Sequence, residues 1–197
     1  MYYATIKKND VANGPGVRVN LFVSGCTHHC KNCFNGDTWD FSYGAPFGDE
    51  QLSEILEALS PNYIKGFTFL GGEPMEPANR CEVLRIAKAI REHFPEKSIW
   101  LYSGYLTEEL MAWAGLVPSS IVPDNEACPR NRYFEEYKPA NDAAELAELL
   151  SLIDVIVDGE YVEERKNLRL KFRGSENQRL VDVKETLSAG EVITLSL

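Results

Sequence analysis

Residues 25–35 read GCTHHCKNCFN and place Cys26, Cys30 and Cys33 on one short loop. Three thiolates can hold three irons of a cubic four-iron, four-sulfur (4Fe-4S) cluster and leave the fourth iron open to bind another molecule. A set of four cysteines would instead indicate electron transfer or a structural centre. The cysteine trio therefore predicts a cluster with one iron available for chemistry.

A structural zinc site is the alternative for this loop, with His28 or His29 as the fourth ligand. Zinc sites of that kind usually pair two cysteines of one loop with two ligands well downstream. No second group of cysteines and histidines follows here. Both histidines also lie between two cysteines, so the loop would have to fold back tightly to bring either one to the same ion. We expect the cluster and keep a zinc-binding adaptor as the alternative.

Four apolar runs have the length and the β-branched and aromatic content of buried strands. Each run leads directly into a loop of small or polar residues, and helical patterns begin near Asp49, near Val83, after Thr107 and after Asp142. Strands that alternate with helices predict a parallel sheet, whose carboxyl-end loops meet at one edge. The runs are 17–23, 67–70, 99–102 and 153–157.

The length of 197 residues predicts one domain, 1–197, and is too short for an eight-fold barrel. We therefore expect an α/β fold, a partial, open (β/α) barrel with mostly parallel strands. A proline-rich segment at about 117–141 interrupts the pattern and is interpreted as an insertion. Alternating apolar residues after 168 suggest terminal strands or a hairpin.

Composition narrows the class of protein. Five cysteines, an odd number, argue against a disulfide framework and favour metal in a reducing compartment, where Cys81 is expected to be a small buried apolar residue. A net charge of −10 makes nonspecific nucleic-acid binding through the whole surface unfavourable. No apolar run is long enough to span a bilayer, and the N-terminus lacks the pattern of a signal peptide. We expect a cytoplasmic protein with no membrane partner.

The spacing of the three cysteines resembles the cluster loop of the radical S-adenosylmethionine (SAM) enzymes. Gly71-Gly72-Glu73-Pro74 resembles the second motif of that family, which contacts the methionyl amino group of SAM largely through its backbone. Glycines permit such contact because no side chain intervenes. Asp158-Gly159 and residues 170–179, LKFRGSENQR, are similar to one branch, the activating proteins of anaerobic ribonucleoside-triphosphate reductase.

The resemblance implies a set of SAM contacts around the cysteines. Asn32 and Cys33 would contribute backbone groups, and Phe34 would shield the cluster and pack beside the adenine. Many members carry an aromatic residue before the third cysteine, whereas this chain has Asn32 there and Phe34 after it. Asp158, next to Gly159, would bind the methionyl carboxylate through a cation or fix the ribose, and its alternative is a capping residue in a turn.

The resemblance further implies an activity and partners. Cys26, Cys30 and Cys33 would hold a 4Fe-4S cluster that reduces SAM, and the resulting radical would take hydrogen from a glycine of the reductase. Reduced flavodoxin or a similar protein would supply the electron. An activase of another glycyl radical enzyme and a small-molecule radical SAM enzyme remain alternatives. For the arginines of 170–179 and for Arg18, simple structural pairing is the alternative to recognition.

Overall fold

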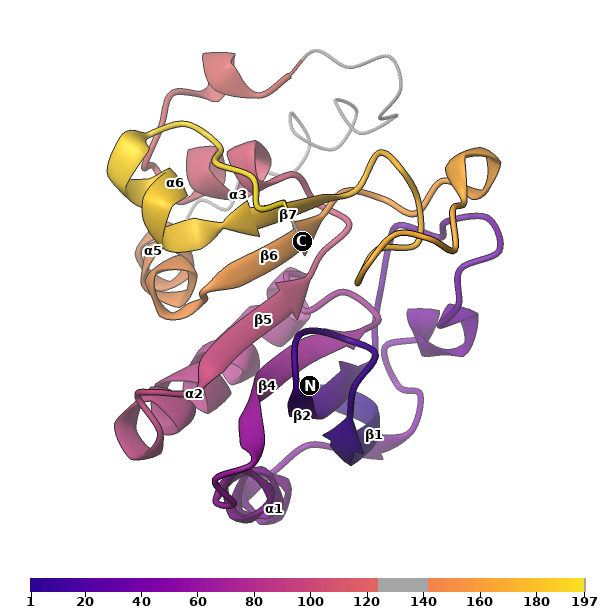
Figure 1. Cartoon of the computed structure of the whole chain (residues 1–197), viewed down its shortest axis with the longest axis vertical. Coiled ribbons are helices and arrows are strands. Elements are labelled where there is room, and N and C mark those ends of the chain that lie inside the picture. Colours follow the sequence, from indigo (N-terminus) through magenta and orange to yellow (C-terminus); the bar gives the residue numbers. More distant parts are fainter. Residues whose placement is uncertain (124–141, 197) are drawn as a thin grey trace.

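One seven-stranded sheet organises the chain, of which the computed structural model describes residues 1–123 and 142–196 (Figure 1). The strand order is β3-β1-β2-β4-β5-β6-β7. The four central strands, β2, β4, β5 and β6, run parallel, while β1, β3 and β7 add antiparallel edges. The strands are β1 (Tyr2–Asp10), β2 (Val17–Val23), β3 (Ala45–Pro46), β4 (Ile64–Gly71), β5 (Ser98–Tyr102), β6 (Val155–Asp158) and β7 (Arg179–Asp182).

Helices cover one face of this sheet and build the main core with it. Each apolar helix stripe meets the strand residues of that face, such as Phe67 and Phe69 of β4, which are fully buried. The helices are α1 (Asp49–Leu59), α2 (Pro77–His93), α3 (Thr107–Trp113), α5 (Ala143–Leu152) and α6 (Val183–Ala189), with short 3-10 turns η1 (Gly36–Trp39), η2 (Ser119–Ile121) and η3 (Glu163–Arg165).

The opposite face of the sheet carries the side chains that alternate with the core. Successive residues of a strand point to opposite faces, so Leu70 lies on the face opposite Phe69. The register sets Val23 beside Gly71 and Tyr102 beside Val157, which aligns the carboxyl ends of the parallel strands. The loops that follow these strands therefore leave the sheet at one edge.

The predicted fold class is confirmed, because an open α/β sheet with a parallel centre is present. The sequence did not indicate β1, whose burial pattern is largely exposed and whose second half is polar. The alternating residues 168–172 form no strand, but the expected terminal strand is present as β7. Residues 193–195 pair antiparallel with β7 through the bridge between Val181 and Thr194, although α6 rather than a tight turn connects them. Cys81 is exposed, so its expected burial is wrong.

Two further expectations concern the insertion and the membrane. Residues 117–123 contain η2, and the remainder of the proposed insertion, together with Cys128, lies outside the described residues. No helix in the described ranges is long and apolar enough to cross a bilayer.

Candidate active site

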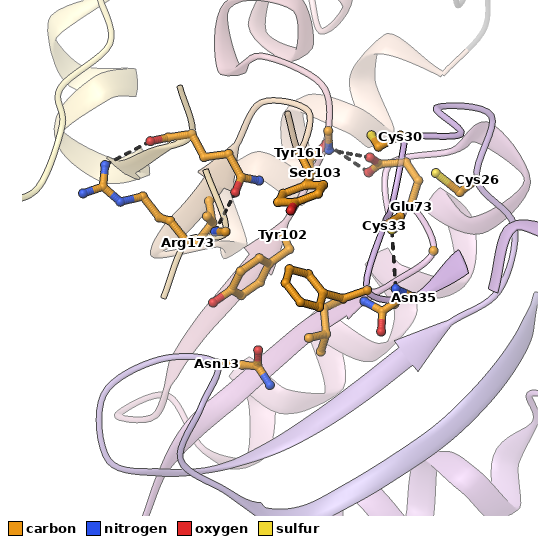
Figure 2. A pocket seen from close by; sticks show the side chains of 18 of the residues that line it. Asn13, Cys26, Cys30, Cys33, Asn35, Glu73, Tyr102, Ser103, Tyr161 and Arg173 are labelled. Atoms are coloured by element: carbon orange, nitrogen blue, oxygen red, sulfur yellow. Dashed lines mark hydrogen bonds between the residues drawn. The ribbon is translucent and has the colours of Figure 1, made fainter. Parts of the chain in front are cut away.

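The loops after β2, β4, β5 and β6 surround a pocket of about 650 Å³ at the carboxyl edge of the sheet (Figure 2). Eight of the sequence-predicted residues line it, whereas Asn32 and Asp158 do not. Phe22, Leu70 and Val157, which come from the sheet face opposite the helices, form an apolar floor. The predicted residues that line the pocket are Cys26, Cys30, Cys33, Phe34, Gly71, Gly72, Glu73 and Gly159.

The cysteine loop has a defined backbone. Its start is fixed by hydrogen bonds from Gly25 N to Thr38 O (2.8 Å) and from Cys26 N to Trp39 O (3.2 Å). Asn32 adopts a left-handed conformation with φ of 57°, which asparagine tolerates better than most residues. Asn35 N donates to Cys33 Sγ at 3.4 Å, an interaction drawn in Figure 2. The loop thus presents its three thiols to the same pocket.

Cys26 is the buried member of the three cysteines. Burial raises the pKa of the Cys26 thiol well above its ordinary value, and the nearby Glu73 carboxylate raises it further. An uncompensated thiolate would be costly at this position, whereas iron displaces the proton and neutralises the charge. Three thiols facing one pocket, one of them already receiving an N–H bond, fit the ligand set of a 4Fe-4S cluster.

Gly71 and Gly72 bring the loop after β4 against the cysteine loop. Gly71 has φ of +105°, and a Cβ on Gly72 would lie 2.6 Å from Gly25 O. Backbone bonds from Gly72 N to Val23 O and from Glu73 N to Gly25 O, both 2.8 Å, join the two loops. The glycines therefore serve first to let two backbones touch, and both also line the pocket.

Glu73 connects three loops from inside the protein. Its side chain is 1% exposed, and its two oxygens accept four hydrogen bonds. Oε1 accepts from Met75 N (2.8 Å) and Ser103 Oγ (2.9 Å), and Oε2 accepts from Gly104 N (2.7 Å) and contacts His28 Nε2 (2.7 Å). These partners use the acceptor capacity of a carboxylate. The carboxylate of Glu73 therefore positions the three loops of the site.

The pKa of Glu73 reflects this arrangement. Burial alone would raise the pKa of this carboxyl group, but the bonds with His28, Met75 and Gly104 hold it below its usual value. The group is thus ionised although it is buried, because its charge is matched by donors.

Two residues that sequence reasoning missed strengthen the same junction. Glu76, 3% exposed, accepts from Thr27 N (2.8 Å) and Thr27 Oγ1 (2.6 Å) through its Oε1. Asn79 Nδ2 donates to Ser24 O and Glu73 O, both at 3.0 Å. Their only signal in the sequence is their position just after the Gly-Gly-Glu-Pro motif, at the start of a helix.

Both histidines of the zinc alternative are directed elsewhere. His28 contacts Glu73, and its ring packs edge-on against Tyr105. The ring of His29 stacks on Trp39 with centroids 4.7 Å apart and an interplanar angle of 4°. The geometry therefore favours the cluster over zinc.

Asp158 has structural partners. It is fully buried, and its Oδ2 accepts from Thr107 N (2.9 Å) and Thr107 Oγ1 (2.8 Å) at the start of α3. Arg179 bonds to both oxygens of Asp158 and to both oxygens of Glu108. Of the two interpretations of Asp158, the geometry favours capping, and Gly159 continues from it into the pocket wall.

Residues 170–179 mostly shape their own loop. Gln178 Nε2 donates to Gly159 O (3.0 Å), and its Oε1 accepts from Gly174 N (2.8 Å). Arg179 is paired as described above, and Arg18, 1% exposed, donates to groups on β4 and β5. For these two arginines the structural alternative is confirmed.

Three polar atoms of the pocket lining lack protein partners in the described part of the chain, and Nε1 of Trp39 is one of them. The hydroxyl of Tyr102 and Nε of Arg173 are buried and have no hydrogen-bond partner among the described residues. Both residues line the pocket on the side away from Cys26 and Cys30 (Figure 2). A buried polar group without a partner is costly, so a polar ligand at this end would relieve the penalty. The pocket therefore fits a ligand with an apolar body and polar groups, as SAM has.

The fold and the site together define a radical SAM-type iron-sulfur protein. The family described as "4Fe-4S single cluster domain" matches residues 12–122 and 130–181. An anaerobic ribonucleoside-triphosphate reductase-activating protein of Enterobacteria phage T4 is 37% identical over 182 residues, 91% of this chain and 93% of the relative.

Two cellular relatives carry the same name. The protein of Vibrio cholerae is 37% identical and that of Escherichia coli strain K12 is 34% identical, each over 171 residues, 86% of this chain and 90% of the relative. The chain belongs to the family of anaerobic ribonucleoside-triphosphate reductase-activating proteins.

Proposed function

We propose that this chain generates the glycyl radical of an anaerobic ribonucleoside-triphosphate reductase. The observation that carries the proposal is the junction of two loops: three thiols and the Gly-Gly-Glu-Pro backbone face one pocket and are held together by Glu73. The reductase is proposed as the partner because the relatives are named as activating proteins of anaerobic ribonucleoside-triphosphate reductase.

The chemistry that the cluster supplies when bound is one-electron reduction of SAM. With that electron, the sulfur to 5′-carbon bond of SAM would break to give methionine, and the 5′-deoxyadenosyl group would leave as 5′-deoxyadenosine after taking a hydrogen atom from a glycine of the reductase. The electron comes from an external donor, and reduced flavodoxin or a similar protein is part of the proposal.

The residues of this chain bind, orient and exclude water. Cys26, Cys30 and Cys33 hold the cluster, and the backbone of Gly71 to Glu73 binds the methionyl end of SAM. The apolar floor keeps water from the reacting atoms, where a reactive radical would otherwise be quenched.

The remaining contacts form the outer part of the pocket. Phe34, which is 68% exposed and packs against Tyr161, covers the outer side, together with the backbone of Cys33 and Gly159. Asn32 shapes the cluster loop through its left-handed backbone, and Asp158 supports the site from behind.

Anaerobic purification with iron analysis tests the proposal. The wild type should be brown and bind about four irons per chain, the content of one 4Fe-4S cluster. Under chemical reduction it should form 5′-deoxyadenosine from SAM, and with the reductase it should give a glycyl radical signal by electron paramagnetic resonance. A colourless zinc protein would refute the proposal. A radical formed only on a different glycyl radical enzyme would move the activity to that partner.

Single alanine substitutions of Cys26, Cys30 and Cys33 should each abolish 5′-deoxyadenosine formation, because each removes one iron ligand. Cys81→Ala is the matched control, since Cys81 is exposed and lies on α2, outside the pocket. Its iron content and activity should equal those of the wild type. Product formation that persists in a cluster-loop variant would contradict the assignment of that ligand.

A further inference from the structure

The loop 163–174, which follows β6, presents an apolar side chain at the mouth of the pocket. Leu168 lines the pocket and is 85% exposed, the largest exposed fraction among the large apolar side chains described. Phe34 lines the same pocket, lies beneath Lys166 of this loop (5.3 Å from Nζ to the ring centroid) and is 68% exposed. Isolated exposed apolar residues are ordinary, but two beside one reactive pocket indicate an interaction surface.

This loop has a defined shape. Asn167 N donates to Gly174 O (3.1 Å) and Glu176 N to Arg165 O (3.0 Å), which closes its neck. Phe172 points inward, where its ring packs edge-on against Trp100. The loop therefore holds Leu168 outward before any partner binds. A loop that is already ordered loses little conformational entropy on binding, as expected of a preorganised binding element.

The loop is also basic in an acidic protein. Arg165, Arg169 and Lys171 are exposed, and none forms an ion pair with any residue in the described ranges. Residues 163–184 carry seven basic and four acidic side chains, whereas the whole chain has a net charge of −10. Charges of this kind at the rim of an interface steer a partner of opposite charge.

We propose that loop 163–174 is the docking element for the reductase, and that it receives an acidic surface with an apolar side chain that fits between Leu168 and Phe34. The inference rests on the proposed function. It adds which part of this chain selects the partner. The glycine segment of the reductase must enter the pocket, and loop 163–174 supplies basic side chains beside the pocket mouth.

Two other occupants fit the surface less well. A second copy of this chain would bring the same basic loop against itself, and like charges repel. An electron donor has to approach the cluster but does not have to insert a segment into the pocket mouth. The experiment below separates both from the reductase.

The charge test compares Lys171→Glu with Lys65→Glu, a matched exposed lysine near the opposite, amino end of β4. Binding of the anaerobically purified, cluster-loaded proteins to the purified reductase is measured by calorimetry at low and moderate salt. Lys171→Glu should weaken binding about tenfold at low salt and reduce its salt dependence, and Lys65→Glu should leave both unchanged. Equal affinities of the two variants would overturn the proposal.

The apolar test compares Leu168→Ala with Leu116→Ala, an exposed leucine just after α3. Truncation of an anchoring side chain typically costs a tenfold or larger loss of affinity, so Leu168→Ala should weaken reductase binding about tenfold while Leu116→Ala should not. Unchanged affinity of Leu168→Ala would overturn the role of Leu168 as an anchor.

Cleavage of SAM without the reductase separates this inference from the proposed function. With a chemical reductant, Lys171→Glu should form 5′-deoxyadenosine at the wild-type rate, and only radical transfer to the reductase should fall. Absence of SAM cleavage in the wild type would refute the proposed function itself. If Lys171→Glu impaired only the reaction driven by a protein electron donor, or only self-association, the surface would belong to that partner and the docking proposal would be wrong.

Discussion

The two walls of the pocket differ in what holds them. The cluster-side wall, residues 24–39 and 71–76, is held by two buried carboxylates, Glu73 and Glu76, that accept bonds from loops. The C-terminal wall, residues 159–178, is held mainly by its own backbone and amide side chains, and Arg179 fixes its base. The carboxylates that hold the first wall are buried, whereas the charged side chains of the second wall, such as Arg165, Arg169 and Lys171, are exposed.

The two walls therefore suit different roles, with cofactor chemistry at the first wall and partner recognition at the second. A site for a cluster and SAM needs groups held within a fraction of an ångström, and buried charge-assisted bonds provide that precision. A docking loop needs a stable shape but an exposed surface, which backbone bonds across its neck provide. We therefore expect changes in the cluster-side wall to affect cofactor retention, and changes in the C-terminal wall to affect partner binding.

The largest effect is expected for Glu73→Gln. The amide replaces one acceptor oxygen by a donor and leaves two of the four donors around residue 73 without an acceptor. The free energy of unfolding should fall by about 3 kcal/mol, because each buried donor left without an acceptor costs about 1–3 kcal/mol. Urea unfolding of the iron-free protein measures the loss, and iron content after gel filtration measures cluster retention.

Glu76→Gln is the control for Glu73→Gln. The bonds from Thr27 all end on Oε1 of Glu76, so a glutamine can keep them with its carbonyl oxygen. Its unfolding free energy should stay within about 1 kcal/mol of the wild type. Equal losses in the two variants would show that Glu73 is not the connection between the loops.

A smaller effect is expected for Gly72→Ala, set against Gly159→Ala in the other wall. The new Cβ at position 72 would meet the backbone oxygen of Gly25 at 2.6 Å, which forces the two loops apart. Overpacking of this kind costs about 1–3 kcal/mol, and iron retention should fall with it.

Gly159 is the comparison in the other wall. Its φ is +93°, and no atom lies closer than 3.7 Å to the position that an alanine methyl group would take there. Gly159→Ala should therefore lower the free energy of unfolding by only about 1 kcal/mol, the cost of a left-handed backbone at alanine. The variant should retain its iron. Thermal unfolding and iron analysis of both variants provide the comparison. Greater iron loss in Gly159→Ala than in Gly72→Ala would contradict the division between the walls.

The third effect, at the lower end of the range for Gly72→Ala, is expected outside both walls, at Asp154. Burial opposes ionisation, but hydrogen bonds from Lys184, Arg91 and Ile99 N hold the pKa of this carboxyl below its ordinary value. A depressed folded-state pKa stabilises the fold above the unfolded-state pKa and loses this contribution as the pH falls through the folded-state pKa. Asp154→Asn should therefore cost about 1–2 kcal/mol near neutral pH.

The pH dependence checks the origin of that effect. The difference in unfolding free energy between Asp154→Asn and the wild type should shrink as the pH is lowered below the ordinary aspartate value of 3.8. Urea unfolding across this range measures it. A difference that does not change with pH would mean that the lost contribution is not that of the charged carboxylate.

Local patterns in the sequence predicted the centre of the fold. The run 17–23 is mostly β-branched and apolar and is bounded by Gly16 and Ser24, and it forms β2 with the same bounds. Apolar patterns did not predict the strands that depend on a neighbouring strand. β1 is mostly exposed and becomes a strand by pairing with β2. Residues 168–172 have the alternation of a strand but pair with no neighbouring strand. Alternation is a property of the segment, and pairing is a property of its surroundings.

The candidate site also has features that the sequence predicted and features that only the fold decided. The sequence by itself determined that Cys26, Cys30 and Cys33 share one loop and that small residues follow each central strand, because spacing along a chain is fixed covalently. Only the tertiary structure decided what the acidic residues do. Glu73 and Asp158 became supports because donors from distant loops occupy their oxygens, and hydrogen-bond partners far apart in sequence are chosen by folding, not by spacing.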